Sequence, residues 1–73
     1  MLRKSPKVGK ILYYVVNDFD GRGIFKVKVT QVTNGYIIAV GLEGGIKGVS
    51  LMFSFLENNI FDTSLEAERY LRG

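Results

Sequence analysis

The chain has 73 residues, no cysteine, no histidine and a formal net charge of +3 at pH 7. Its length allows one domain, and the missing thiols and imidazoles exclude disulfides and the common zinc ligand sets. The hydrophobic fraction of 47% is sufficient for a compact core, so we expect the domain to fold with no metal and no cofactor.

The positive charge is concentrated at the N-terminus. The first ten residues contain four basic side chains and no acidic one, whereas the remaining residues carry six basic and seven acidic side chains. We therefore divide the chain into a basic arm at residues 1–9 and a single small domain at residues 10–73. No apolar run directly follows the basic stretch at residues 1–7, and the most apolar stretch, residues 36–42, is only as long as a strand. These features predict a cytoplasmic protein without a membrane-spanning helix.

The first two strands are predicted at residues 10–17 and 24–32. Residues 10–17 are rich in β-branched and aromatic side chains, which favour strands. The turn between the strands contains Asp20-Gly21, a pair that supplies the positive φ of a tight hairpin. The second strand alternates between an inward face and an outward face. The inward residues are Phe25, Val27 and Val29, and the outward residues are Lys26, Lys28 and Thr30.

Three further strands are predicted before residue 62. Residues 36–40 form a continuous apolar run after an Asn34-Gly35 turn, which predicts a strand buried on both faces. A flexible, glycine-rich connection at residues 41–45 leads to a strand at residues 46–56, and residues 60–61 form a very short fifth strand. In the fourth strand, Val49, Leu51, Phe53 and Phe55 alternate with Ser50, Met52 and Ser54.

A helix is predicted to begin after Thr63. The sequence from Thr63 to Glu66 is a capping box, in which Thr63 accepts from the N–H of Glu66 and Glu66 accepts from the N–H of Thr63. Ala67, Tyr70 and Leu71 then share one face. A helix of about two turns is unstable alone, so we expect this face to pack on the sheet.

These elements predict a mainly β fold, a small five-stranded SH3-like barrel with a short C-terminal α-helix. An OB-like barrel is the alternative, because short β domains of both kinds share the same local signals. We expect a closed barrel, because closure would hide the edges of the apolar strand at residues 36–40.

Residues 59–71 resemble the closing segment of small SH3-like proteins from prophages and mobile elements of Gram-positive bacteria. In both, a short strand ends in an aromatic residue and is followed by Thr, two intervening residues, Glu-Ala and a helix ending in Leu. The matching residues are Phe61, Thr63, Glu66, Ala67 and Leu71. Leu65 stands where an acid is expected, and Tyr70 is bulkier than the usual small residue. The resemblance implies the fold and a phage or mobile-element origin, and it transfers no functional residue because that family has no agreed biochemical function.

The residue types argue against catalysis, so we expect no enzyme and no small-molecule substrate. Without His or Cys, the chain lacks the usual general base near neutral pH and the thiol nucleophile. Asp18 and Asp20 are best interpreted as solvated turn residues. A calcium loop starting at Asp18 would place Arg22 and Val29 at ligand positions, and the glycines of residues 41–48 lack the order of a phosphate-binding loop.

Two binding hypotheses remain. The first is a non-catalytic accessory module of phage or mobile-element type that contacts a protein partner or another copy of itself. Its interface would be an apolar patch of Tyr14 and Met52, unless the C-terminal helix covers that face. The near-neutral charge of residues 11–73 favours this hypothesis.

The second hypothesis is a nucleic-acid-binding barrel. Basic side chains of the arm and the second strand would contact phosphates, and exposed tyrosines would stack on bases. The contact residues would be Arg3, Lys4, Lys7, Lys10, Lys26 and Lys28. Strand lysines also serve simply to protect edges and maintain solubility.

Overall fold

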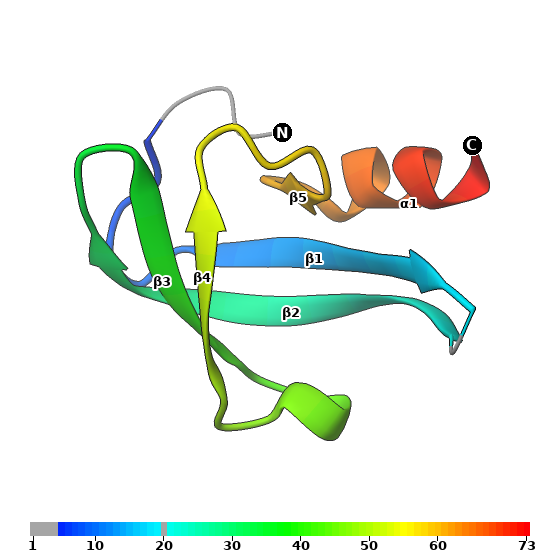
Figure 1. The fold of residues 1–73 in the computed structure, drawn as a ribbon, viewed down its shortest axis with the longest axis horizontal. Helices are drawn as coiled ribbons and strands as arrows, with labels where there is room; N and C mark the ends of the chain where they lie inside the picture. The colour runs from blue at the N-terminus through cyan, green and yellow to red at the C-terminus, as the bar shows by residue number, and fades with distance from the viewer. Residues whose placement is uncertain (1–4, 20) are drawn as a thin grey trace.

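The computed structural model describes residues 5–19 and 21–73, which form one antiparallel sheet and one short helix (Figure 1). The helix α1 is Ser64–Arg72, and a 3₁₀ turn, η1 (Gly44–Ile46), precedes the fourth strand. The five strands are β1 (Ile11–Asp18), β2 (Gly21–Val32), β3 (Tyr36–Gly41), β4 (Ser50–Ser54) and β5 (Ile60–Phe61). The prediction of a mainly β fold with a C-terminal helix is confirmed.

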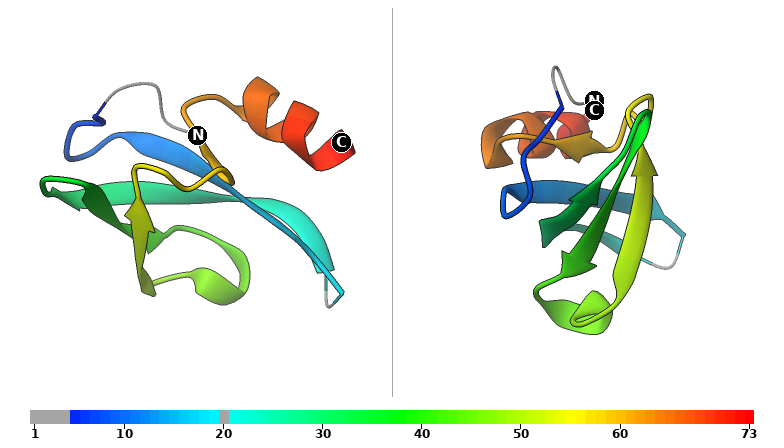
Figure 2. Two further views of the ribbon diagram at one scale, coloured as in Figure 1. Left: turned by 45° about the horizontal axis from the view of Figure 1, so that its top comes forward. Right: turned by 90° about the vertical axis from the view of Figure 1, so that its left-hand side faces the viewer.

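The sheet is curled into a half-barrel. Strands β1 to β4 follow one another as a meander, and β5 returns beside β1, so the order is β4-β3-β2-β1-β5. Figure 2 shows the curl from two further sides, with β3 and β4 turned across the long β1–β2 hairpin. This arrangement is consistent with a small SH3-like barrel.

The half-barrel is open, so the closure expected from the sequence is not found. Within residues 5–19 and 21–73, β4 pairs only with β3 and β5 pairs only with β1. The apolar strand β3 is nevertheless protected, because it lies between β2 and β4. The two edge strands of the sheet are β4 and β5 instead.

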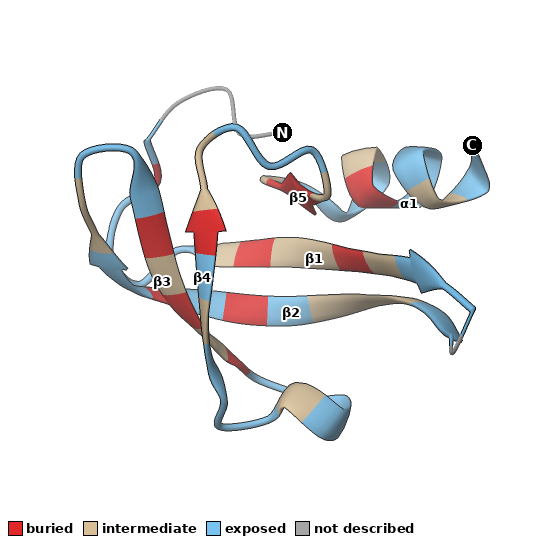
Figure 3. Cartoon of the chain, in the orientation of Figure 1, coloured by how far each residue is buried: buried red, intermediate tan, exposed pale blue. Residues whose placement is uncertain are grey.

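The main core lies inside the curl, where the inward faces of the strands meet (Figure 3). Tyr14 of β1 packs edge-on against Phe53 of β4, with 5.1 Å between the ring centroids. The buried members of this core are Leu12, Val27, Val29, Ile37, Ala39, Phe53 and Ile60. Because they come from all five strands, the core fixes the curl of the whole sheet.

A second, smaller cluster lies on the other face of β1, beneath α1. Val15, Phe61 and Ala67 are buried there, and half-buried Tyr13 and Leu71 pack against them. Strand β1 is therefore covered on both faces, by the core on one side and by the helix on the other. The prediction that the helix packs on the sheet is confirmed.

The first hairpin is tighter than predicted. Strand β2 begins at Gly21, which pairs directly with Asp18, and the N–H of Gly21 donates to Oδ1 of Asp18 at 3.2 Å. Gly21 does not have the positive φ expected of the Asp-Gly pair, and Asp20 lies outside the described residues. The Asp18 side chain, rather than a glycine conformation, therefore supports the hairpin end.

Two other strand predictions need correction. Strand β3 alternates, with Ile37 and Ala39 buried but Ile38 and Val40 only half-buried, so it is not buried equally on both faces. Strand β4 covers Ser50–Ser54 rather than residues 46–56, because η1 and a turn at Gly48, with φ of +80°, occupy the residues before it.

The helix cap is half of the predicted capping box. The Thr63 side chain accepts from the N–H of Glu66 at 3.2 Å, as expected. The Glu66 carboxylate accepts from the Thr63 hydroxyl at 3.4 Å instead of from the Thr63 N–H. Tyr70 lies at the edge of the helix interface, where its ring is tilted against Phe61 with centroids 5.3 Å apart.

The connection between β3 and β4 is ordered by a close backbone approach, so the prediction of a flexible segment was wrong. The N–H of Gly41 donates to the carbonyl of Val49 at 2.9 Å, and Gly41 is buried. A Cβ atom at Gly41 would lie 2.1 Å from the backbone oxygen of Ile46. Only glycine therefore fits at this point, where η1 folds back on β3.

This contact predicts the effect of Gly41→Ala. The added methyl group meets backbone atoms that cannot rotate away, so we expect the free energy of unfolding to fall by about 2 kcal/mol in urea denaturation. Gly45→Ala is the matched control, because a Cβ there has nothing within 4 Å, and its effect should stay within about 0.5 kcal/mol. Equal stability of the two variants would contradict this account of the loop.

Candidate functional site

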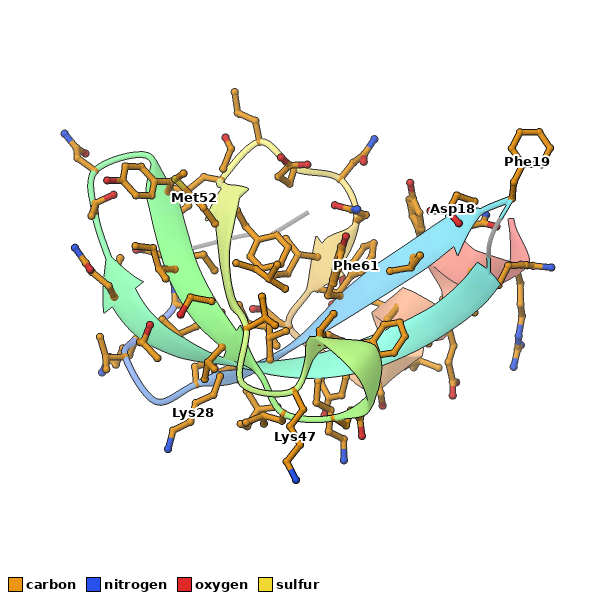
Figure 4. All side chains as sticks on the ribbon, turned by 60° about the horizontal axis from the view of Figure 1, so that its bottom comes forward. Asp18, Phe19, Lys28, Lys47, Met52 and Phe61 are labelled. Carbon is orange, nitrogen blue, oxygen red and sulfur yellow. The ribbon has the colours of Figure 1, made fainter. Side chains whose placement is uncertain are left out.

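The structure separates Tyr14 and Met52, the two residues of the predicted apolar patch. Tyr14 is half-buried in the main core against Phe53, whereas Met52 lies on the outer face of β4 and is 67% exposed. Figure 4 shows Met52 on β4. Helix α1 covers Tyr13 and Val15, on the opposite face of β1 from Tyr14, and it leaves Met52 uncovered.

Met52 belongs to a different apolar group, formed by β3 and β4. Met52 pairs with Ile38, while Ser54 pairs with Tyr36 and Ser50 with Val40. Paired residues of adjacent strands lie on the same face of a sheet, so Tyr36, Ile38, Val40 and Met52 form a continuous outer surface. We call these four residues the outer patch.

The outer patch ends at the unpaired edge of β4. The N–H of Gly41 donates to Val49 and the N–H of Phe55 donates to Gly35, so the odd-numbered residues of this segment bond to β3. In an antiparallel ladder the alternate residues direct their N–H and C=O groups away from the partner strand. Ser50, Met52 and Ser54 therefore direct their backbone groups outward.

Part of this edge is satisfied locally. The Ser54 carbonyl accepts from the N–H of Glu57 at 3.0 Å, and the Ser54 hydroxyl accepts from the N–H of Leu56 at 3.1 Å. No hydrogen bond from another described segment reaches the outward backbone groups of Ser50 and Met52. We call the outward groups of Ser50, Met52 and Ser54 the β4 edge.

Apart from the local bonds at Ser54, the β4 edge has none of the features that usually discourage strand pairing. Natural edge strands carry lysine, proline, a bulge or an inward charge, which discourage a further strand from adding. Strand β4 has the sequence Ser-Leu-Met-Phe-Ser, and its ladder with β3 is regular. Among the described strand pairs, the register shift lies in β2, between Val29 and Gln31.

The predicted nucleic-acid contacts fall into separate groups. Lys26 and Lys28 lie on the outer face of β2, where Lys26 pairs with Tyr13 and Lys28 lies between Ile11 and Val40. Figure 4 shows Lys28 projecting from the same side of the molecule as Lys47. A carboxylate accompanies them, because Glu43 accepts a hydrogen bond from the backbone N–H of Lys26 at 3.1 Å.

The described part of the arm lies elsewhere. Lys7 and Lys10 line a cavity of about 360 Å³ together with Ser5, Pro6 and Asp62. The N–H of Lys10 donates to the Lys7 carbonyl across a turn in which Gly9 has φ of +94°, and the N–H of Gly9 donates to Val29. Arg3 and Lys4 are outside the described residues. The structure therefore does not assemble the six predicted basic residues into one surface.

A second apolar feature is at the tip of the β1–β2 hairpin. Phe19 is fully exposed there and projects away from the molecule (Figure 4). Below the tip, a cavity of about 280 Å³ is lined by Val16, Asp18, Gly21, Arg22 and Phe25. Arg22 is held in place by donating to the Leu71 carbonyl at the end of α1.

Residues 5–19 and 21–73 contain no group of three or more His, Cys, Asp or Glu side chains placed to hold a metal ion. No helix in the same part of the chain is long and apolar enough to cross a membrane.

Comparison of the chain with protein-family models, with curated proteins and with solved structures finds no match. The resemblance of residues 59–71 to prophage proteins therefore stays a prediction.

Sequence reasoning identified Met52 but missed the surface to which it belongs. The alternation of Ser50, Met52 and Ser54 with apolar residues did place Met52 outward. The missing information was that β4 is the last strand in the sheet order, because a strand's neighbours are not encoded in its own residues.

The separation of Tyr14 and Met52 predicts that their substitution affects stability to very different extents. Tyr14→Ala removes a ring that packs against Phe53, so the free energy of unfolding should fall by about 2–3 kcal/mol. Met52→Ala removes an exposed side chain and should change it by no more than about 0.5 kcal/mol. Urea denaturation followed by circular dichroism measures both, and a large loss for Met52→Ala would mean that Met52 packs in the core.

Proposed function

We propose that this domain is a non-catalytic binding module that acts through protein–protein contacts at the β4 edge and the outer patch. The observation that carries the proposal is the unprotected edge of β4, which lies directly beside exposed Met52. When a partner adds a strand to a sheet edge, it needs free backbone groups and nearby side chains to contact, and β4 offers both. The main chain supplies hydrogen bonds, and the side chains supply specificity.

The surroundings of β4 support this mode of binding. The strand is held rigidly by its ladder to β3, and Phe53 anchors it in the main core. A partner strand would therefore meet a preformed edge and would not have to order it, which lowers the entropic cost of binding. The outer patch continues onto β3, so a bound segment can also contact Tyr36 and Ile38.

The chemistry of the chain supports a role without catalysis. It contains no His and no Cys, so it lacks the side chains that most often act as general base or thiol nucleophile near neutral pH. On the resemblance of residues 59–71, we further propose that the module is of phage or mobile-element type and acts in the cytoplasm.

A second candidate function is nucleic-acid binding, favoured by the position of Lys28 beside the outer patch. Lys26 and Lys28 share one face of β2, and Tyr36 on the same outer face is 37% exposed. Basic side chains that share a face with an exposed aromatic ring are a common arrangement for single-stranded nucleic acids. Glu43 beside Lys26 weakens this candidate, because a carboxylate repels phosphates.

Site-specific photo-cross-linking tests the proposed protein contact. A photoreactive phenylalanine analogue at position 52 should give a discrete adduct with a protein in cells that express the full chain. The same analogue at Leu65, which is 55% exposed on α1, is the control. An adduct from position 52 alone supports the β4 edge as the binding surface. The same adducts from both positions, or none from position 52, would overturn the proposal.

Fluorescence anisotropy with labelled single-stranded and duplex oligonucleotides tests the second candidate. It predicts micromolar binding that weakens steeply with salt and is lost in the variant Lys26→Glu/Lys28→Glu. The variant Arg69→Glu/Arg72→Glu makes the same change of charge on α1 and should retain binding. Absence of binding at physiological salt, or equal losses in both variants, would exclude a nucleic-acid surface on β2.

A further inference from the structure

We infer that the partner of the β4 edge is β4 of a second copy of this chain, paired antiparallel about a two-fold axis through Met52. This inference rests on the function proposed above and names its occupant. A two-fold interface requires a surface that is complementary to itself, and β4 meets this requirement in its side chains, its backbone groups and its flanking charges.

The side chains of β4 are nearly symmetric about Met52. The strand reads Ser-Leu-Met-Phe-Ser, so in this register Met52 lies opposite Met52 of the second copy and Leu51 lies opposite its Phe53. Ser50 lies opposite Ser54 of the second copy, at both ends. Each pair joins residues of the same face, since Ser50, Met52 and Ser54 are outward and Leu51 and Phe53 are inward.

The backbone groups select the same register. Ser50, Met52 and Ser54 direct their N–H and C=O groups away from β3, and the two-fold through Met52 brings them opposite one another. The two Met52 residues can exchange two hydrogen bonds. At each end the Ser54 N–H can donate to the Ser50 carbonyl of the other copy, whereas the Ser54 carbonyl already accepts from Glu57. A shift of one residue would place the outward groups opposite residues whose backbone groups already bond to β3. The hydrogen bonds between the two copies would then not form.

The charges beside β4 are complementary under the same two-fold. The strand itself carries no charge, but Lys47 is five residues before Met52 and Glu57 is five residues after it. Pairing about Met52 therefore brings the Lys47 end of each copy to the Glu57 end of the other. Both side chains are exposed, and Figure 4 shows Lys47 projecting outward from the connection between η1 and β4.

The size of the interface sets its strength. The contact consists of a strand of five residues and the part of the outer patch beside it. Its buried area is therefore at the low end of the range for specific interfaces. The exposed Met52 side chains of the two copies bury one another at its centre, where apolar contacts contribute most. We therefore expect a reversible dimer whose population rises with protein concentration, with the two half-barrels joined as one continuous sheet.

Cysteine cross-linking tests the register, because the natural chain has no cysteine. Opposed residues that exchange hydrogen bonds in an antiparallel pair have Cα atoms about 5.5 Å apart, within the range of a disulfide. Under mild oxidation, Met52→Cys should form a covalent dimer about tenfold faster than Leu65→Cys. A mixture of Ser50→Cys and Ser54→Cys should cross-link to each other faster than either does to itself. Equal rates for Met52→Cys and Leu65→Cys would overturn the inference.

Sedimentation velocity on the unmodified chain, from micromolar to millimolar concentration, tests association without a cross-link. Met52→Lys should abolish the dimer, because it places two like charges opposite one another. Lys47→Glu should lower the association constant by about fivefold, and the double variant Lys47→Glu/Glu57→Lys should restore it. A chain that stays monomeric at all concentrations would overturn self-pairing. In that case, a protein adduct formed by the photoreactive group at position 52 would still support the proposed function with a different partner.

Discussion

The structure depends on the long antiparallel pair of β1 and β2, which runs for eight residues from Ile11 opposite Lys28 to Asp18 opposite Gly21. Strand β1 has a partner on each edge and a packed layer on each face. Its inward side chains enter the main core, and its outward side chains support α1. Without β1, neither β5 nor α1 has a surface to pack on, because both contact the sheet mainly through it.

The elements that local chemistry determines were predicted well from the sequence. The alternation of residues 24–32 placed Val27 and Val29 inward and Lys26 and Lys28 outward, as the structure has them. Thr63 caps α1 as expected, because its side chain needs only the N–H of Glu66 three residues later. The short strand at Ile60–Phe61 was also correct. In each case the deciding interaction joins residues close in the chain or repeats with a short period.

The features that were missed depend on contacts between distant segments. Gly41 was interpreted as part of a flexible connection, but the backbone of Ile46 folds back onto it. Tyr14 was assigned to the surface, because its sequence neighbours do not reveal that Phe53 of β4 lies across the core. The candidate site was only half predicted for the same reason. Met52 was placed outward correctly, but the free edge of its strand follows from the order of the whole sheet.

The hydrogen bond from Arg22 to the Leu71 carbonyl has a consequence for the order of folding. It joins residues 49 positions apart, whereas the β1–β2 pair closes through a turn of two residues. Local hairpins close quickly, while distant contacts form only after the loop between them has been ordered. The hairpin that carries Arg22 is thus available early, as a template on which the last strand and the helix dock late. The C-terminal segment should accordingly be the first part of the domain to detach when the native state opens locally.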